Sequence, residues 1–581
     1  MGFARLRRGG SALILIIAAC VMLAPAATAA VRTARPADQL AGSVGVNVHL
    51  HFSGSVYDRG YAAIVKPKLL AAGIRHVRDG AYIYGGAASS SYYNRCRDLA
   101  AAGIRFNLLT SFKTRWSEPT DPSKLDDIYR WCNGGVESFE GVNEPDLQPI
   151  PPGYPDWKAQ TVQAQKALFK AVNDNAAIRH VSVLGPTIVW APTAVGDLSA
   201  HVDYGNWHPY PGGQCPTCGD VYGQNIDTFM PKYRTPSGAK PMIATETGYH
   251  NAINQGAGGH RPASELAAGK YTPRLALEYF NRGFVRTYFY ELIDAKPEPA
   301  KTDRDAHFGL LRHDGSEKPA YRALKSLLTL TRDPGPSFTP GSLDYTISGD
   351  TSRVHQTLLQ KRNGTFLLAL WVERSSYHTG ASPNAPDQVS ARRDLTVPEQ
   401  GVKLTFATPT TPATIHRFQN DGSTTRTTVT PTAGTLALNV SDRLTVVQFS
   451  RPKAATALGN EPPRLGRVRF SRKVLVMRAR GRAAGRRARR VPKLSLRYSI
   501  SEAATLAIAI KRVRPGRRHA RSQRGVRRMT VRAERGRHST RLRSRLVRRL
   551  RPGRYRARVT AIDGLGARSR TRTAVLRVRH P

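Results

Sequence analysis

The sequence predicts an α/β chain with a (β/α)8 TIM barrel, followed by an antiparallel β-sandwich and a small basic all-β domain. Residues 42–331 repeat one unit, in which an amphipathic helix ends at a glycine and a short apolar strand follows. Residues 335–450 lose the helical period and alternate apolar with polar positions. With 581 residues, the chain is too long for a single hydrophobic core.

Two copies of the barrel repeat are visible by eye. The segments at 68–80 and 97–109 share AAGIR, with Gly73 and Gly103 where a helix needs a left-handed cap. The alternative, an open doubly wound sheet, is disfavoured because no phosphate-binding glycine loop accompanies the strands. Eight apolar runs are the expected strands: 44–52, 74–80, 104–112, 139–145, 181–187, 202–210, 242–248 and 285–294.

The boundaries follow from composition. We expect the barrel at 38–334, the sandwich at 335–451, a linker at 452–463 and a basic β module at 464–581. Within the module, arginines alternate with Tyr, Ala and Val over 554–559, which predicts a folded strand, whereas 480–490 is expected to be a solvated loop. The segment LRPGRYRARVTAIDGLGARS resembles an immunoglobulin-like module of bacterial secreted proteins.

The net charge of +48 is concentrated in the basic module. From residue 461 onward there are 40 Lys and Arg against four acidic residues, and 37 of the 40 are Arg. The guanidinium fork suits phosphate, sulfate or carboxylate, so an acidic cell-wall or extracellular polymer is a candidate partner. Nucleic acid is disfavoured by the absence of a recognition-helix pattern, and compositional drift toward Arg remains an alternative.

Residues 1–29 have the pattern of a signal peptide. Three arginines precede an apolar stretch from residue 12 to 23, and Ala27-Thr28-Ala29 fits a signal-peptidase site. The stretch is too short for a membrane anchor, and no later run could span a bilayer. We therefore expect a secreted or cell-surface protein; lipoprotein processing at Cys20 is an alternative.

Removal of the leader leaves four cysteines, an even number in an exported chain, so disulfides are expected. Cys215 and Cys218 form a CPTC segment that could be a redox or metal motif, but no second CxxC accompanies it, which favours a local bridge. Cys96 and Cys132 would then pair between neighbouring helices.

Two glutamates stand where buried strands are expected to end. Glu144 lies in FEGVNEPD and Glu246 in PMIATETGYH, and the carboxyl ends of barrel strands share one face. Cleavage of a glycosidic bond with retention needs two carboxyl groups about 5–5.5 Å apart, one attacking the anomeric carbon and one protonating the leaving oxygen. Paired carboxylates at this face therefore suggest hydrolysis of a sugar bond.

Asn-Glu-Pro after the fourth strand, His-x-Tyr at the sixth and Glu at the seventh resemble the retaining barrel glycosidases of clan A, especially families 5 and 39, over residues 42–335. The resemblance implies Glu144 as acid/base and Glu246 as nucleophile. It also implies Asn143 at the sugar 2-hydroxyl, and its remaining counterparts, all beside the nucleophile, are Arg78, His208 and Tyr210.

The sequence departs from these families in two places. Many relatives carry a Trp platform at the eighth strand, where this chain has Tyr290, so we expect Tyr290, Trp207 or Trp190 to stack on sugar. A counterpart of the third-strand histidine of family 5 is not evident. The roles of five further polar residues remain open between sugar binding and structure: His49, His51, Asp79, Glu291 and Asp294.

The expected function is a secreted retaining glycoside hydrolase acting on a poly- or oligosaccharide, without metal or cofactor. The alternative from another class is a non-catalytic carbohydrate-binding protein on a barrel scaffold with an adhesion module. Transglycosylation would use the same residues. The sugar and linkage stay open, because loops set them.

Overall fold

The computed structural model describes residues 30–82, 87–115, 117–219, 225–256, 259–381, 387–408, 410–450, 463–476, 493–501, 504–513, 527–542, 544–547, 550–562 and 568–579. The chain divides into two compact units, Met1–Pro452 and Lys453–Pro581, which are taken separately below. The expected leader at 1–29, most of the linker and the expected loop at 480–490 lie outside the described residues.

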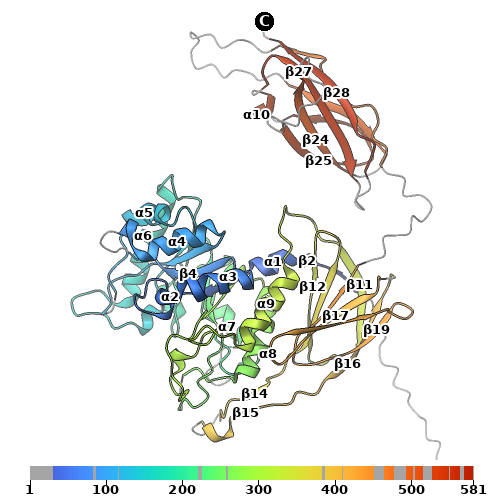
Figure 1. Cartoon of the computed structure of the whole chain (residues 1–581). Helices are drawn as coiled ribbons and strands as arrows, with labels where there is room; N and C mark the ends of the chain where they lie inside the picture. Colours follow the sequence, from blue (N-terminus) through green and yellow to red (C-terminus); the bar gives the residue numbers. More distant parts are fainter. Residues whose placement is uncertain are drawn as a thin grey trace, which may run out of the picture. The chain divides into compact units, whose positions relative to one another are not determined.

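Eight parallel strands form the core of the first unit, and the expected fold class is confirmed (Figure 1). The order along the sheet is β7-β6-β5-β4-β3-β10-β9-β8. The ends meet where Leu184 bridges Tyr204 and the N–H of Gly185 donates to the Tyr204 carbonyl at 2.9 Å, which closes the barrel. The strands are β3 (Val44–Asn47), β4 (His76–Gly80), β5 (Arg105–Leu109), β6 (Val136–Glu140), β7 (Ser182–Leu184), β8 (Gly205–Trp207), β9 (Met242–Thr247) and β10 (Arg286–Phe289).

Seven of the eight expected runs contain their strand, but the fourth boundary was wrong. The run was placed at 139–145, whereas β6 covers Val136–Glu140. Gly141 follows directly, and a Cβ there would come within 2.2 Å of the Gln165 side chain and 2.8 Å of the Pro186 nitrogen. Only glycine fits at position 141, because any side chain there would collide with Gln165 and Pro186. Since β6 ends at Glu140, Glu144 lies four residues beyond the strand, in the loop that follows it.

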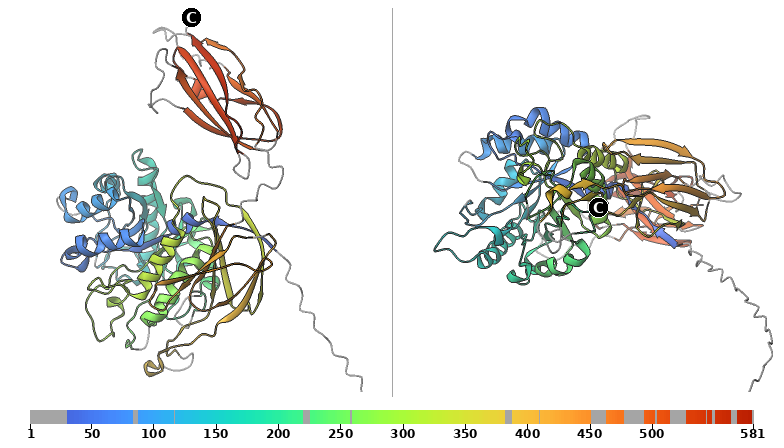
Figure 2. Two further views of the ribbon diagram at one scale, coloured as in Figure 1. Left: turned by 45° about the vertical axis from the view of Figure 1, so that its right-hand side comes forward. Right: turned by 90° about the horizontal axis from the view of Figure 1, so that it is seen from below.

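Helices surround the barrel (Figure 2). Their caps follow the sequence: Asp156 accepts from the Ala159 N–H at the start of α6, and Ser264 accepts from the Ala267 N–H at the start of α8. The helices are α1 (Ala37–Gly42), α2 (Val56–Arg59), α3 (Lys66–Ala72), α4 (Ser91–Ala101), α5 (Leu125–Trp131), α6 (Trp157–Asp174), α7 (Ile226–Tyr233), α8 (Glu265–Asn281) and α9 (Pro319–Thr331), with a π-helical turn at Tyr61–Val65.

A two-sheet β-sandwich completes the first unit. One sheet has the order β1-β11-β16-β19 and the other β18-β17-β20-β13-β12-β2. Residues 30–36 supply β1 and β2, one edge strand to each sheet, which sequence analysis had not assigned to the sandwich. The strands are β1 (Ala30–Thr33), β2 (Arg35–Pro36), β11 (Ser342–Gly349), β12 (Val354–Gln360), β13 (Phe366–Val372), β16 (Gln400–Phe406), β17 (Ala413–Phe418), β18 (Thr424–Val429), β19 (Thr435–Val440) and β20 (Thr445–Phe449), with a separate hairpin of β14 (Tyr377–His378) and β15 (Arg393–Asp394).

Helix α8 is buried along almost its whole length, because it lies between the barrel and the sandwich (Figure 1). Its charged residues therefore need partners from the sandwich. The Arg274 guanidinium lies 2.7 Å from Glu373, and Lys270 Nζ lies 2.8 Å from Asp442. These pairs fix the sandwich against the barrel helices.

Replacing His355 with Gln is expected to destabilise the protein near about pH 6 and to have little effect near about pH 9. His355 Nδ1 on β12 lies 2.6 Å from Glu278 Oε1 on α8. This hydrogen bond raises the pKa of His355. Because the folded pKa is raised, the contribution is complete below about 6.5 and is lost as pH rises through the folded pKa.

The low-pH limit is set by Glu278. Burial alone would raise its pKa, but the His355 hydrogen bond and the Arg282 charge lower it, so its share disappears only as pH falls below the usual carboxyl range. The His355 side chain is 37% exposed, so we expect only about 0.5 kcal/mol, measured as thermal midpoints of variant and wild type at both pH values. His201→Gln serves as control, and equal destabilisation at both pH values would contradict the ion pair.

The cysteines agree with the expectation in one of two pairs. Cys215 and Cys218 form a disulfide. Cys96 on α4 and Cys132 after α5 are both fully buried free thiols and form no disulfide. Burial, and then the neighbouring Cys132 thiol, raise the pKa of Cys96 well above its usual value, which reflects how close the two cysteines lie. The prediction that Cys96 and Cys132 are neighbours is therefore confirmed. The predicted disulfide between them is wrong, because the two buried thiols pack together without being oxidised.

The second unit consists of two sheets, with orders β21-β23-β26 and β22-β28-β27-β24-β25. The alternation expected at 554–559 is confirmed: Arg554, Arg556 and Arg558 are exposed, whereas Tyr555 and Ala557 are buried. No helix among the described residues is long and apolar enough to cross a membrane. The strands are β21 (Arg469–Phe470), β22 (Val474–Val476), β23 (Ser495–Ile500), β24 (Ala504–Val513), β25 (Arg527–Ala533), β26 (Gly536–Arg541), β27 (Gly553–Ile562) and β28 (Arg572–Arg579), with α10 at Ser544–Val547.

Candidate active site

Glu144 occupies a strained turn after β6. Its backbone is left-handed, with φ 45° and ψ 51°, which costs a non-glycine residue roughly 1–3 kcal/mol. The Glu144 N–H donates to the Thr187 carbonyl at 2.9 Å, and Pro145 opens the short 3-10 helix Pro145–Leu147. These contacts hold the carboxylate at the carboxyl-terminal face of the barrel.

Glu246 lies on β9 and is held at both carboxylate oxygens. Arg78 Nη1 on β4 donates to Oε1 at 2.6 Å, and the Tyr210 hydroxyl donates to Oε2 at 2.9 Å. Burial, followed by the charge of Glu246, raises the pKa of Tyr210 well above its usual value, so the phenol remains a donor. Glu246 is thereby fixed as an acceptor, with its oxygens positioned by two rigid neighbours.

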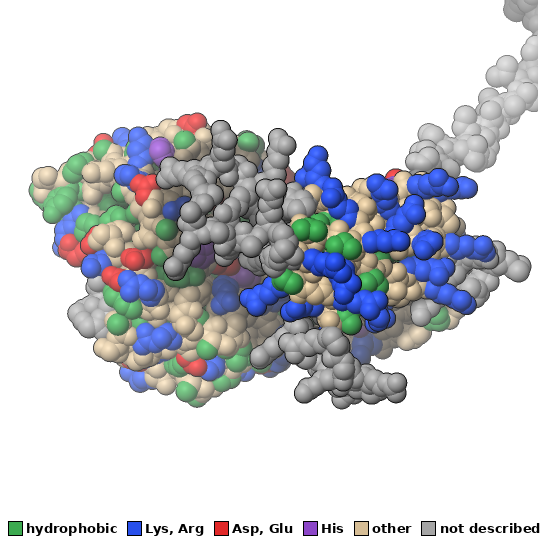
Figure 3. All heavy atoms as spheres, turned by 90° about the horizontal axis from the view of Figure 1, so that it is seen from above, with side chains coloured by type: hydrophobic (Ala, Val, Ile, Leu, Met, Phe, Trp, Pro, Cys, Tyr) green, Lys and Arg blue, Asp and Glu red, His purple; other side chains and the backbone are tan. Residues whose placement is uncertain are grey.

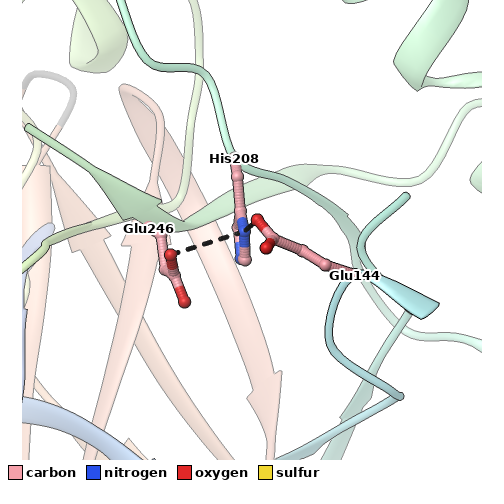
Figure 4. A group of neighbouring side chains, drawn as sticks. All are labelled: Glu144, His208 and Glu246. Atoms are coloured by element: carbon pink, nitrogen blue, oxygen red, sulfur yellow. Dashed lines mark hydrogen bonds and ion pairs between the residues drawn. The ribbon is translucent and has the colours of Figure 1, made fainter. Parts of the chain in front are cut away.

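His208 stands between the two glutamates (Figure 4). Its Nδ1 lies 2.7 Å from Glu144 Oε1 and 3.6 Å from Glu246 Oε2. One oxygen of each carboxylate and the imidazole nitrogen all lie within 4.8 Å of one another. The structure therefore brings the two glutamates, one from the loop after β6 and one from β9, to one place.

Arg78 organises the floor of the site through a residue that sequence analysis did not identify. Its Nε and Nη2 donate to the two oxygens of Glu140, both at 2.8 Å, and Glu140 is fully buried at the end of β6. Burial alone would lower the pKa of Arg78, but Glu140 and Glu246 raise it, so the guanidinium stays charged. Glu140 neutralises the charge of Arg78 and holds its guanidinium so that Nη1 points to Glu246.

A hydrogen-bonded chain connects Glu140 to Glu144 through Thr245 and His208. The Thr245 hydroxyl lies 3.0 Å from a Glu140 oxygen and 2.8 Å from Asn206 Oδ1, and both are acceptors. Because the hydroxyl proton goes to one of these, its oxygen accepts from His208 Nε2, 2.9 Å away. His208 Nε2 is therefore assigned as protonated, and one further proton is shared between Nδ1 and Glu144.

The carboxyl of Glu144 is shifted toward its ionised form. Burial alone would raise its pKa, but the hydrogen bond from His208 and the charges of His208 and Arg78 outweigh burial and lower it. The His208 Nδ1, 2.7 Å from Glu144 Oε1, is thus the main group that favours the ionised form of this carboxyl.

Two expected substrate-binding residues are open to the site. Asn143 Oδ1 accepts from Arg78 at 2.7 Å, which leaves its amide nitrogen without a partner among the described residues. Tyr290, directly after β10, is partly exposed and lies edge-on to Phe308 at a centroid distance of 5.4 Å. Both can therefore contact a bound sugar.

The tryptophans divide differently from the expectation. Trp207 is 1% exposed and stacks on Tyr233 of α7 at 4.6 Å, so it cannot form a sugar platform, and that expectation is wrong. The position alternates outward from the barrel strand, toward the helices. Trp190 is 67% exposed, and its backbone N–H donates to the Asp146 carboxylate at 2.7 Å, two residues from Glu144.

The strand-end residues left open by the sequence separate into two groups. Asp79 accepts from His51 Nδ1 at 2.6 Å and from the Leu50 N–H, and Asp294 lies 2.8 Å from Lys318 Nζ, so both carboxylates hold local structure. His49 Nε2 lies 3.2 Å from Glu291 Oε2, and the buried Glu291 Oε1 has no hydrogen-bond partner among the residues that the structure describes.

Glu144, His208 and Glu246 have the donor types of a metal site. The charged Arg78 guanidinium, 2.6 Å from Glu246, would repel a divalent cation there, and the Glu246 oxygens already accept from Arg78 and Tyr210. The second group of this kind, Glu278, His355 and Glu373, is interleaved with Arg274 and Arg282. Both arrangements are those of ion-pair networks.

Sequence analysis missed Glu140, Thr245 and Asp146. Glu140 precedes the Asn-Glu-Pro motif by three residues, and Thr245 precedes Glu246. Both are fully buried polar residues next to apolar ones, Phe139 before Glu140 and Ala244 before Thr245, and a polar residue at such a position is the signal that could have identified them. The inward alternation of a barrel strand makes such a position face other strands rather than solvent.

The chain resembles several solved structures in fold. No protein-family model matches the chain, and no curated protein matches its sequence. Similar solved structures include glycoside hydrolases of families 39, 30 and 51. A family 39 enzyme from Xanthomonas axonopodis pv. citri has 15% identity and a TM-score of 0.48, covering 72% of this chain and 95% of its own. A glucosidase from Croceicoccus marinus has 12% identity and a TM-score of 0.46, covering 73% and 99%. At these values the similarity concerns the fold alone, and the argument for function rests on the site.

Proposed function

We propose that the chain is a secreted retaining glycoside hydrolase that cleaves O-glycosidic bonds of a poly- or oligosaccharide by double displacement. The observation that carries the proposal is the approach of Glu144 and Glu246 to within 4.8 Å at the carboxyl-terminal face of the barrel. Retention needs carboxyl groups about 5–5.5 Å apart, whereas inversion needs about 6.5–9.5 Å to admit a water between them.

The environments of the two glutamates assign their roles. Both carboxylate oxygens of Glu246 accept hydrogen bonds, one from Arg78 and one from Tyr210, which suits the nucleophile. Glu144 shares a proton with His208, which suits the acid/base. In the first step a Glu246 oxygen bonds to the anomeric carbon as the bond to the leaving oxygen breaks, and the shared proton passes through Glu144 to that oxygen.

The second step reverses the proton transfer. Once the sugar is attached, Glu246 has lost its charge, and Glu144 can take a proton from a water that attacks the anomeric carbon. The glycosyl bond to Glu246 then breaks and the carboxylate returns to its donors. In this proposal the Asn143 amide nitrogen holds the 2-hydroxyl, and partly exposed Tyr290 and exposed Trp190 stack on sugar rings.

Export is part of the proposal. The signal-peptide pattern of residues 1–29 supports it, since its last residue directly precedes β1, which begins at Ala30. The disulfide between Cys215 and Cys218 is consistent with an oxidising compartment. Export is tested by sequencing the N-terminus of the protein recovered from culture medium, by Edman degradation or mass spectrometry. We expect this N-terminus to be Ala30.

The function is tested by screening aryl glycosides and polysaccharides and following the first product by proton NMR. We expect the anomeric proton of the product to appear first in the configuration of the substrate and to mutarotate later. A first product of the opposite configuration would replace retention by inversion. No turnover on any member, combined with saturable sugar binding, would instead indicate a non-catalytic carbohydrate-binding barrel.

A further inference from the structure

The second unit presents a surface of arginines that no acidic residue in its described part pairs with. On β27, the burial pattern places every second residue outward, and these positions include Arg554, Arg556 and Arg558. On β28, Arg577 and Arg579 are exposed in the same way. In Figure 3, Lys and Arg side chains dominate the face of this unit that the view presents.

Part of this surface is hollowed. A groove of about 1750 Å³ runs along β28 and over the first residues of β22 and β27, and eight Lys or Arg side chains line it with no acidic residue among them. Six of the eight are Arg467, Arg512, Arg554, Arg572, Arg577 and Arg579. The groove is therefore a concave surface whose charged side chains are all positive, and such a shape concentrates the positive potential where an anion would bind.

The cations of the groove are placed against one another. Arg554 and Arg577 are direct cross-strand partners in the antiparallel register of β27 and β28. Like charges directly opposite each other destabilise a sheet. None of the eight groove cations forms an ion pair with a described acidic residue, so this repulsion is uncompensated within the described part of the chain. An anionic ligand would relieve it.

The side chains between the arginines restrict the kind of anion. Val474 and Val575 are 42% and 44% exposed and line the same groove, so apolar strips alternate with charge. The large exposed hydrophobic residues of the described part of this unit include no aromatic ring on which a base could stack. Its described helix has four residues, too few to enter a major groove. Sugar rings, with apolar faces and charged substituents, fit both features.

We propose that this groove binds a linear acidic polysaccharide, whose carboxylate or sulfate groups pair with the arginine forks while its ring faces lie on the valines. The site is independent of the barrel chemistry. It would hold the enzyme on an acidic extracellular matrix whatever bond the barrel cleaves.

The test compares two double variants of the full chain that lose the same charge. Arg554→Gln/Arg577→Gln removes the facing pair in the groove. Arg537→Gln/Arg541→Gln removes two exposed arginines of β26, which do not line it. Binding to polygalacturonate and heparin is measured over a salt series, with neutral dextran and duplex DNA as further probes.

We expect the groove variant to bind polygalacturonate or heparin roughly 10- to 100-fold more weakly, with a salt slope smaller by roughly one per arginine removed. The β26 variant should change binding less than about threefold. Because the groove variant loses the repulsion between Arg554 and Arg577, its thermal midpoint without polymer should rise. A lower midpoint would instead reveal a folding defect. Equal losses in both variants, or DNA bound as tightly as the polysaccharides, would overturn the proposal.

Discussion

Replacing Glu246 with Ala is expected to lower kcat by roughly four to six orders of magnitude on every glycoside, because no other group can form the covalent bond to the anomeric carbon. Arg78 and Tyr210, which hold the Glu246 oxygens, would then face the vacated space with two donors. Azide should bind there and attack once, so added azide restores turnover and yields a glycosyl azide of inverted configuration. Initial rates and product NMR measure both effects.

The variant should remain folded, since Arg78 keeps its bidentate contact with the buried Glu140. Its thermal midpoint verifies this. Glu118→Ala is the matched control, because the Glu118 side chain is 78% exposed. Residual activity within tenfold of wild type, or an azide product with the substrate's configuration, would remove Glu246 from the nucleophile role.

Replacing Glu144 with Ala should produce a loss that depends on the leaving group. Natural sugars and other poor leaving groups need protonation, so their turnover should fall by roughly 10²- to 10⁴-fold. Dinitrophenyl glycosides leave without a proton, so formation of the glycosyl-enzyme should stay close to the wild-type rate. A Brønsted plot of kcat/KM against leaving-group pKa, steep in the variant and shallow in wild type, measures the difference.

The pH dependence gives a second measure of the same role. Activity of wild type on poor leaving groups should fall as pH rises, because the Glu144–His208 pair then loses its shared proton. This limb should be absent from Glu144→Ala. Glu144→Gln keeps a side chain of similar shape beside His208 and controls for positioning. An equal loss on all leaving groups would contradict the acid role.

Much of the barrel could be predicted because its signals are local. The helices and strands of the repeat follow from their own periodicity, and several helix ends follow from a nearby residue, such as Gly73 after α3, Asp156 before α6 and Ser264 before α8. The strand-end glutamates were recognisable for the same reason. The exposed arginines of β27 followed from a period of two, which the burial pattern reproduces.

Errors arose where neighbours distant in the chain decide. The end of β6 depends on the close packing of Gly141 against Gln165 and Pro186, which no local pattern announces. Whether Trp207 faces sugar or core depends on Tyr233, 26 positions later, and the two N-terminal strands find partners more than 300 residues away. In each of these three cases the residues near in sequence fit both the expected and the observed arrangement.

The sequence by itself determined the alternation of helices and strands, the identity of the two glutamates and the charge of the last unit. Only the tertiary structure decided that Glu144 and Glu246 meet within 4.8 Å, that His208 joins Glu144 to Thr245 and the buried Glu140, and that arginines of two strands face one another across a groove. The physical reason is that periodicity is set by the backbone geometry of neighbouring residues. Distances between side chains are set by strand register and barrel closure, which depend on the packing of the whole unit.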